Sequence, residues 1–488
     1  MQQDGMTLEE DCPALPAAPP LGIARKTAYG LGQMAEGIVT IVFMIYLLFY
    51  YNQVLGLSGS ATGLALFAAL LIDSVADPLM GAISDHTRSR WGRRHPYMYL
   101  AVLPLPLCFY LLFVPPAGLG QTELFLWLLA FAVLSRLALT IFFVPHLALG
   151  AELSNDYRVR NQIVAYRQFF AMLGYLVALV IGFGFFFVAS PGIANGQMNP
   201  EVYGPYAATM ALVMALGMLI SAAGTHRCIP HLRHDEAPGD AQRAPFWRDS
   251  LDTLRNPSFR ILMIGLLIFY VGFGVRTSLS LHLLTHYWAL GPDAIELVTI
   301  ASILALIAGI VVWAVAGQWI EKRTGFILGF VGWIVLTAWP VLQTLAGFYP
   351  PAGALGHVGI LLWTGVFASL FGAATNIFAG SMIADCIDEH ELLTGRRQEG
   401  AFFGVFTVAA KATTGLGTWI GGLALDLIGF PANAKPGTVS EAALFDLGLL
   451  TGPVLITGGL AALIFLRRYS ISRQRLAEIQ AALRERPA

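Results

Sequence analysis

Two aspartates, Asp73 and Asp77, lie four residues apart in an apolar run from about Thr62 to Ala82. This spacing places both carboxylates on one face of a helix, one turn apart. Charged side chains at membrane depth cost from a few to roughly 10 kcal/mol, so they usually mark an ion or substrate path. Two neighbouring anions also repel unless a cation or proton is present. The pair is therefore predicted to bind Na⁺ or H⁺, and the alternative is a structural pair hydrogen-bonded to a neighbouring helix.

The acid pair lies in one of twelve predicted membrane spans. Hydrophobic residues are 56% of the 488-residue chain and charged residues only 12%, against about 25% charged in soluble domains. The mean hydropathy of +0.67 excludes a water-soluble enzyme with a single anchor. A span needs about 20 apolar residues. Twelve such runs are predicted, with room for an interfacial turn at the end of the tenth: 28–51, 61–84, 97–115, 124–149, 164–189, 206–229, 260–287, 294–318, 325–346, 356–384, 400–428 and 443–466.

Basic residues are distributed unevenly among the loops. Four of the 29 Lys and Arg residues are assigned to the predicted spans themselves, namely Arg136, Arg167, Arg276 and Lys411. Of the others, only Lys435 falls in a loop after an odd-numbered span; the rest lie in the tails, in the even-numbered loops or at the span ends beside them. The positive-inside rule places that basic side in the cytoplasm. Both tails are therefore predicted to be cytoplasmic, in a plasma membrane that would be the inner membrane of a Gram-negative bacterium.

The chain divides into two halves with a faint internal repeat. Gly81–Asp85 and Gly317–Glu321 both read Gly-x-x-x-acid and both precede basic residues. Repeated halves with a substrate site between them are common in secondary transporters. We therefore predict an all-α membrane protein of two pseudo-symmetric six-helix bundles. The predicted segments are a cytoplasmic tail 1–27, the bundles 28–229 and 260–466, a cytoplasmic central loop 230–259 and a cytoplasmic amphipathic tail 467–488.

The C-terminal tail has apolar residues at helical spacing among six Arg residues. This pattern is typical of a helix that lies on the surface of a membrane. A solvated tail helix is the alternative, and the pattern does not separate the two.

Nothing in the chain predicts an enzyme, a cofactor or a nucleic-acid partner. The four cysteines are scattered, with no CxxC pair that would indicate a disulfide framework or a zinc site. The sequence has no P-loop, no paired histidines with metal-ligand spacing and no GxSxG motif. It also lacks a polar segment large enough for a catalytic domain outside the bilayer.

Three blocks resemble the glycoside–pentoside–hexuronide:cation symporters, a branch of the major facilitator superfamily that includes the melibiose carrier. The first runs from Asp77-Pro-Leu-Met-Gly to Arg93-Arg-His-Pro-Tyr. The second begins at Pro145-His-Leu-Ala and ends at Tyr166-Arg167. The third begins at Ala384-Asp385-Cys-Ile-Asp388 and ends at Lys411. The resemblance covers all twelve spans in order and implies the major facilitator fold.

The resemblance implies roles for single residues. Asp73 and Asp77 match the cation-binding acids of the family; they would also be metal ligands if the ion is sodium. Glu36, Arg167 and Lys411 match residues at or near the sugar site. The chain departs from the melibiose carrier at four aligned positions, so galactoside recognition and sodium are not carried over. These positions are Phe142 for an Asp, His146 for a Trp, Leu139 for a Thr (with Thr140 adjacent) and Asn376 for a Trp.

Lys411 and Arg167 are predicted to be buried cations in opposite halves. Each should find an acid, because an unpaired charge in a span is costly. We expect Lys411 to pair with the empty acid site and to release it when a cation enters. Arg167 and Glu36 would then contact a polar ligand from two sides. The alternative for Lys411 and Arg167 is ion pairing between the halves without ligand contact.

His146 and Asn376 are candidate substrate contacts, and ordinary hydrogen bonding between helices is the alternative for both. Arg136 and Arg276 have no predicted partner.

The loop after the second span is predicted to act in gating. Asp85 can accept hydrogen bonds from a helix N-terminus and from cytoplasmic arginines such as Arg93 and Arg94, which would hold the inner gate closed. The matching residues of the second half are Asp385, Asp388, Arg396 and Arg397. The alternative is that these charges only set the topology.

The predicted function is secondary active transport: cation (Na⁺ or H⁺) symport of a sugar, glycoside or sugar acid by alternating access. The first alternative is a cation-coupled symporter of lysolipids or similar amphipaths on the same fold. The second is a sensor that binds a solute without transport. The partners are a small-molecule solute and the lipid bilayer, and the sequence leaves the oligomeric state open.

Overall fold

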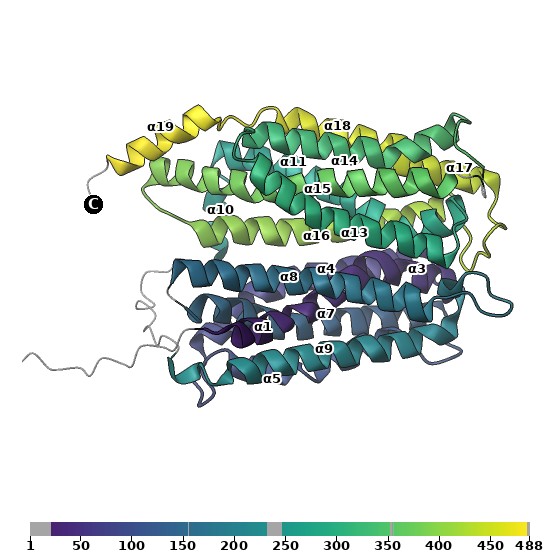
Figure 1. The fold of residues 1–488 in the computed structure, drawn as a ribbon, viewed down its shortest axis with the longest axis horizontal. Coiled ribbons are helices and arrows are strands. Elements are labelled where there is room, and N and C mark those ends of the chain that lie inside the picture. Colours follow the sequence, from purple (N-terminus) through teal and green to yellow (C-terminus); the bar gives the residue numbers. More distant parts are fainter. Residues whose placement is uncertain (1–20, 155, 232–245, 352–353, 355, 486–488) are drawn as a thin grey trace, which may run out of the picture.

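The computed structural model describes residues 21–154, 156–231, 246–351, 354 and 356–485. Within these residues the fold is all-α, as predicted, with the helices in two layers that correspond to the two halves of the chain (Figure 1). The expected N-terminal tail lies almost entirely outside the described residues. So do most of the polar part of the central loop and the last three residues.

The first half, the N-half, contains six membrane-crossing units. The first is a helix with two π-helical segments, and the fifth ends in a third. In chain order the elements are α1 (Ile23–Leu31), α2 (Gln33–Ile41), η1 (Val42–Tyr46), α3 (Leu47–Phe49), η2 (Tyr50–Val54), α4 (Gly59–His86), α5 (His95–Ala101), α6 (Pro104–Leu112), α7 (Gln121–Glu152), α8 (Tyr157–Ile181), η3 (Gly182–Phe186), η4 (Gly196–Met198), η5 (Pro200–Val202), α9 (Tyr203–His226) and η6 (Ile229–His231).

The second half, the C-half, repeats this plan and adds a short helix at each end. The elements are α10 (Phe246–Thr253), α11 (Pro257–Ser278), α12 (Ser280–His282), η7 (Leu283–Tyr287), α13 (Pro292–Ala316), α14 (Lys322–Leu345), α15 (His357–Thr394), α16 (Glu399–Leu427), α17 (Glu441–Leu449), η8 (Leu450–Val454), α18 (Leu455–Leu466) and α19 (Arg473–Arg484).

Eleven of these units are long and apolar enough to cross a membrane. The twelfth is α16, which has 29 residues but is rich in glycine and threonine and carries Lys411. It packs against α4 of the N-half and α11 of its own half. The tenth unit, α15, has no interfacial turn: it continues as one helix to Thr394 and ends where Gly395 adopts a left-handed conformation with φ of 73°.

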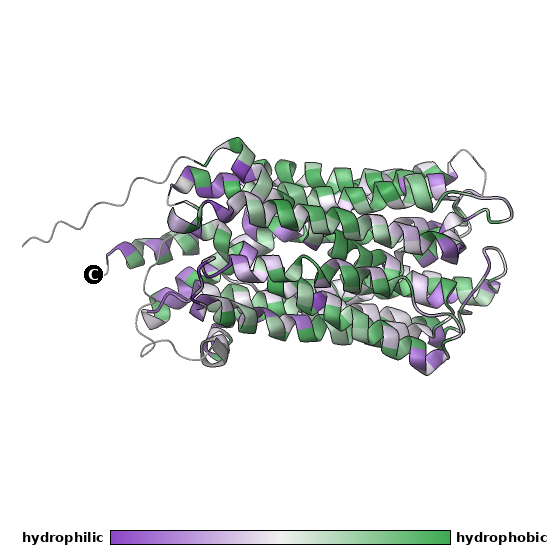
Figure 2. Ribbon diagram, turned by 90° about the horizontal axis from the view of Figure 1, so that it is seen from below, coloured by the Kyte–Doolittle hydropathy of each residue, from purple (hydrophilic) through white to green (hydrophobic). Residues whose placement is uncertain are grey.

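Figure 2 shows an apolar band between two polar ends, as expected for a membrane protein. We call the end that carries the described chain ends, α10 and α19 the terminal face, and the other end the opposite face (Figure 1). The terminal face is the side with the predicted excess of Lys and Arg.

The two halves share an apolar core only toward the opposite face. The large core of the N-half continues into C-half residues near that face, such as Leu279, Leu283 and Phe430. A separate core, which includes Phe259 and Phe402, fills the part of the C-half nearer the terminal face. The halves are therefore joined at one end and have separate interiors at the other.

Glycines allow α4 and α16 to pack closely across the boundary between the halves. A Cβ atom at Gly422 would overlap the carbonyl oxygen of Gly59, and one at Gly63 would lie 2.8 Å from the Cα of Trp419. The Asp426 carboxylate then accepts hydrogen bonds from the backbone N–H groups of Gly59 and Ser60, both at 2.8 Å. These first amides of α4 have no partner within their own helix.

The C-terminal helix α19 packs against α15 through its apolar side. Ile479 is fully buried, and Leu476 and Leu483 contact the second core. The Gln480 amide donates a hydrogen bond to Asp388 (3.2 Å). This packing favours the alternative of a solvated tail helix, and the placement of α19 on the inner leaflet stays a prediction.

Candidate functional site

Asp73 and Asp77 lie on α4 and point at the same threonine. The Thr140 hydroxyl, from α7, lies 2.7 Å from Asp73 Oδ1 and 2.9 Å from Asp77 Oδ1. Asp73 is 1% exposed, and the Asp77 side chain is 18% exposed. One hydroxyl proton cannot be donated to two carboxylates at once. Three oxygens therefore converge on a place where one more cation or proton would be stabilised.

Lys411 joins the acid pair to the other half of the molecule. Its ammonium, on α16, donates to Asp73 Oδ2 (3.0 Å) and to Asp77 Oδ2 (2.5 Å). The lysine side chain is 25% exposed. The sequence predicted this pairing of Lys411 with an acid in span 2, and the structure places it across the boundary between the halves.

Arg136 supplies a second positive charge, which the sequence left without a partner. Its guanidinium lies 3.8 Å from Asp73 Oδ2 and 4.3 Å above the Phe43 ring. Arg136 and Thr140 are four residues apart on α7 and so share one face. This spacing could have indicated that both residues face the acid pair. The alignment with the family instead placed Leu139, one residue away, at the position of the cation-site Thr.

Glu36 and Arg167 do not form an ion pair within the described part of the chain. The Glu36 carboxylate accepts hydrogen bonds from its own helical segment, from Thr40 (2.9 Å) and Gln33 (3.2 Å). Arg167, on α8, lies near the hydroxyl of Tyr29. Both residues are partly exposed.

The two remaining candidates for substrate contact differ in exposure. His146 is fully buried: its ring stacks on Tyr29 with centroids 4.2 Å apart, and its Nε2 lies 2.9 Å from the Tyr29 carbonyl oxygen. Asn376 is exposed on α15 and has no hydrogen-bond partner among the described residues. The contacts of His146 with Tyr29 are therefore ordinary interhelical packing, whereas the Asn376 amide is available to a ligand.

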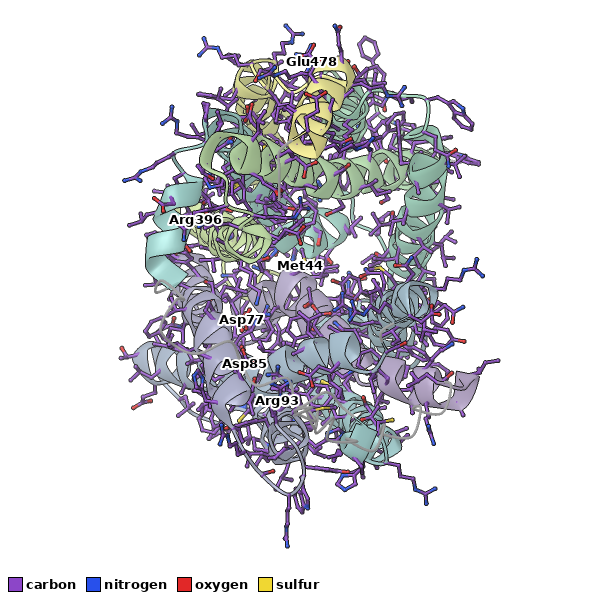
Figure 3. The ribbon with its side chains drawn as sticks, turned by 90° about the vertical axis from the view of Figure 1, so that its left-hand side faces the viewer. Met44, Asp77, Asp85, Arg93, Arg396 and Glu478 are labelled. Carbon is purple, nitrogen blue, oxygen red and sulfur yellow. The ribbon has the colours of Figure 1, made fainter. Side chains whose placement is uncertain are left out.

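The predicted gating charges lie at the terminal face, where Figure 3 labels Asp85, Arg93 and Arg396. Their described ion pairs stay within one half. In the N-half, Arg94 pairs with Asp85 (2.5 Å) and with Glu152 (2.9 Å), which also binds Arg93 (3.1 Å). Glu152 was not among the predicted residues.

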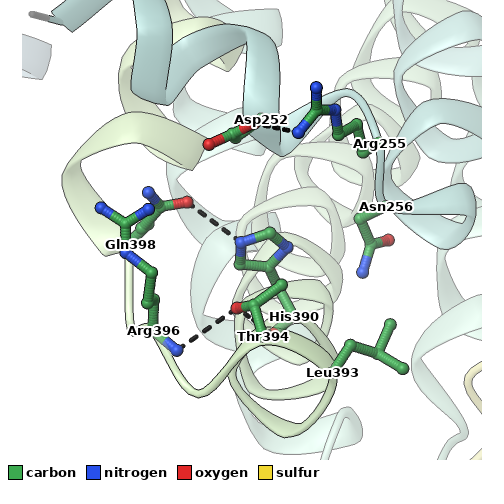
Figure 4. A pocket seen from close by; sticks show the side chains of 8 residues that line it. All are labelled: Asp252, Arg255, Asn256, His390, Leu393, Thr394, Arg396 and Gln398. Atoms are coloured by element: carbon green, nitrogen blue, oxygen red, sulfur yellow. Dashed lines mark hydrogen bonds and ion pairs between the residues drawn. The ribbon is translucent and has the colours of Figure 1, made fainter. Parts of the chain in front are cut away.

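The C-half has the equivalent pairs. Lys322 binds Asp385 (2.6 Å), and Arg397 binds Asp388 (3.1 Å) and two glutamates. These carboxylates raise the pKa of Arg397 above its ordinary value. Arg396 lines a small hollow of about 160 Å³ between α10 and the end of α15, together with Asp252, Arg255 and His390 (Figure 4).

Polar bonds between the halves gather instead at the opposite face. Their donors and acceptors come from the ends of the first and seventh units, from η4 between the fifth and sixth units, and from the loop after α16. The pairs are Asn52 with His282 (3.3 Å), Gln53 with the Pro431 carbonyl (3.2 Å) and the Ala434 amide (3.2 Å), Gln197 with Thr285 (3.2 Å), and Asn433 N–H with the Asn52 carbonyl (3.2 Å). The halves are therefore closed on each other at this face.

Arg276, on α11, is partly buried and forms no ion pair within the described residues. Its Nε atom is buried without a hydrogen-bond partner. The structure adds no role for it.

Two repeated six-helix halves, with charged residues between them at mid-membrane, define a secondary transporter of the major facilitator class. The model of the MFS/sugar transport protein family matches residues 28–473. The chain belongs to this family, and the resemblance seen in the sequence is confirmed. Its relatives are transporters, so the prediction that the chain is not an enzyme is confirmed as well.

Several curated proteins match almost the whole chain. An uncharacterized symporter of Synechocystis is 23% identical and covers 96% of this chain and 98% of its own. The isoprimeverose transporter of Lactiplantibacillus pentosus is 24% identical, with 96% and 95% covered. The mouse sphingosine-1-phosphate transporter MFSD2B is 25% identical, with 89% and 86% covered.

Among solved structures, the inward open xylose transporter XylE of E. coli superposes with a TM-score of 0.59 at 14% identity. The match covers 93% of this chain and 98% of that one. At this identity the likeness concerns the fold alone.

Proposed function

We propose that this protein couples the downhill entry of one small cation to the uptake of a sugar, glycoside or sugar acid. The observation that carries the proposal is the geometry of Asp73, Asp77, Thr140 and Lys411. Two acids of one half share a hydroxyl and are neutralised by a lysine of the other half. An ion that enters this site must compete with Lys411, so ion binding acts directly on the contact between the halves.

Charge counting indicates how the coupling works. Asp73, Asp77, Arg136 and Lys411 sum to zero, so an added Na⁺ or H⁺ leaves an excess positive charge in a low-dielectric region. Withdrawal of the Lys411 ammonium, the most exposed member, relieves this excess. By linkage, a solute that binds better after this withdrawal also strengthens binding of the ion by the same factor.

Both candidate ions fit the oxygen atoms present. A proton would complete the hydrogen bonds between Thr140 and the two carboxylates. Sodium would be held by Asp73, Asp77 and the Thr140 hydroxyl. Separate sodium and proton gradients distinguish the two ions.

The proposed solute site uses Glu36 and Arg167, which are partly exposed, and Asn376, which is exposed. No ion pair or hydrogen bond joins these three among the described residues. An exposed amide in the middle of a membrane helix is costly against lipid, which favours a water-filled path on that side of α15. The isoprimeverose transporter among the relatives supports a sugar derivative. The mouse relative supports a second candidate, a lysolipid or similar amphipath.

We also propose that the terminal face lies in the cytoplasm, as the distribution of basic residues predicts. The structure would then be closed toward the outside. Cleavage of an N-terminal tag by protease added only outside sealed cells would contradict this orientation.

The test is uptake into proteoliposomes from a panel of sugars, sugar acids and lysolipids, with sodium and proton gradients imposed separately. We expect one gradient to drive accumulation of one solute class. Asp73→Asn and Asp77→Asn should each reduce accumulation to passive equilibration, whereas Asp293→Asn, an exposed acid at the start of α13, should not. Ion-driven accumulation in either site variant, or equal uptake without any gradient, would refute the proposal.

A further inference from the structure

A hollow of about 500 Å³ lies on the side of the N-half, near the terminal face. It is lined by Arg25 of α1, by Ile220, Ala223 and Gly224 of α9, and by Arg227 just after α9. It is separate from the ion and solute sites described above, which lie between the halves.

One wall of this hollow is apolar and continues along the surface of the membrane span. Leu216, Ile220 and Ala223 follow one another at helical spacing and are all exposed, Leu216 by 50% and Ile220 by 45%. Gly224 keeps the floor open to α1, because a Cβ atom there would lie 2.6 Å from that of Ala28. An exposed apolar stripe in a membrane helix is a surface for acyl chains.

The polar end of the hollow carries two guanidinium groups and no acid. Neither Arg25 nor Arg227 has a carboxylate within 4 Å in the described part of the chain, whereas Arg93, Arg94 and Arg397 at the same face are all paired. Arg25 lies close to Cys228, at the end of α9, and so approaches Arg227 from the other helix. The described residues thus leave the two charges without a compensating carboxylate.

We propose that this hollow, between α1 and α9, binds a phospholipid with a net anionic headgroup. The two arginines hold the phosphate, because guanidinium groups form charge-assisted hydrogen bonds with phosphate oxygens. The acyl chains lie along Leu216, Ile220 and Ala223. Basic pockets between membrane helices at headgroup depth are suited to this chemistry. The proposal does not depend on the identity of the solute or coupling ion.

The test is native mass spectrometry of the purified full-length protein titrated with phosphatidylglycerol. Arg25→Gln and Arg227→Gln should each weaken binding of the first lipid roughly five-fold, and the double variant should weaken it further. Ala223→Trp keeps both charges and fills the hollow, and it should also lower occupancy. Arg468→Gln is the matched control, since Arg468 is exposed at the same face, just after α18, and does not line this hollow.

Headgroup competition separates the sources of the phosphate. Phosphatidylethanolamine should bind more weakly than phosphatidylglycerol, and inorganic phosphate should not displace the lipid. Equal binding of both lipids, displacement by inorganic phosphate, or an equal loss in Arg468→Gln would overturn the proposal. Circular dichroism and size-exclusion profiles show whether each variant is folded, and the two single arginine variants test the site independently of each other.

Discussion

At the residue scale, the proposed coupling site depends on hydrogen bonds that each residue makes with a partner on another helix. Thr140 is the residue that links the two acids, since its hydroxyl contacts both. Removal of a hydrogen bond to a charged group costs about 1.5–3 kcal/mol. The threonine is thus expected to matter for ion binding although its hydroxyl carries no charge.

Thr140→Val should therefore weaken the apparent affinity for the coupling ion at least about ten-fold, while Thr140→Ser should retain it. The measurement is solute uptake or solute binding as a function of ion concentration. Leu139→Ala, at the position that the family alignment indicates, is the control. A larger effect at Leu139 than at Thr140 would show that the site in solution differs from this geometry.

Lys411 is expected to have a different role from Thr140, because its positive charge balances the two acids when no ion is bound. Lys411→Met would leave Asp73 and Asp77 with only Arg136 nearby, and breaking a buried ion pair typically destabilises a protein by about 3–5 kcal/mol. We expect a lower thermal unfolding temperature in the absence of the coupling ion. The double variant Lys411→Met/Asp77→Asn should recover most of the loss, and equal instability of both variants would contradict the charge balance.

At the scale of elements, α16 controls how closely the halves approach. Its glycines face α4 of the other half and α11 of its own half. A side chain at Gly422 would meet backbone atoms of α4, which cannot move aside as a flexible side chain can.

Gly422→Leu should push the halves apart at the opposite face. The expected result is faster labelling of a cysteine introduced at Gln53, which is 1% exposed in the closed arrangement. Gly400→Leu is the control on the same helix, since a Cβ atom there meets open space. Unchanged labelling in Gly422→Leu would mean that the α4–α16 contact does not control access.

At the scale of the whole molecule, the proposed transport cycle requires that the closed face open and that the two halves approach each other at the terminal face. The bonds that hold the opposite face closed join residues far apart in sequence, such as Ser60 and Asp426. A covalent link at that contact should trap the molecule in this one state.

The pair Ser60→Cys/Asp426→Cys should therefore lose transport when oxidised and regain it on reduction. Each single variant under the same oxidant is the control for loss of the Asp426 hydrogen bonds and for reactions of the native cysteines. Uptake that continues after complete crosslinking, measured by gel mobility after cleavage of the central loop, would contradict alternating access between the halves.

The sequence by itself determined the features that follow from local patterns. Twelve apolar runs and the basic bias of alternate loops define the spans, because the bilayer requires long apolar helices. The spacing of Asp73 and Asp77 placed both acids on one face, and Lys411 could be paired with them because a buried lysine needs an acid. The amphipathic pattern of Arg467–Arg486 also indicated a helix.

Only the tertiary structure decided which helices meet. It selected Thr140 over Leu139, gave Arg136 its acid, formed no ion pair between Glu36 and Arg167 among the described residues, and packed the apolar side of α19 against α15. It also showed that the halves are joined at the opposite face. These outcomes depend on the rotation and crossing of helices that are distant in sequence, and a one-residue change on a helix turns a side chain by about 100°. Local periodicity carries no information about that choice.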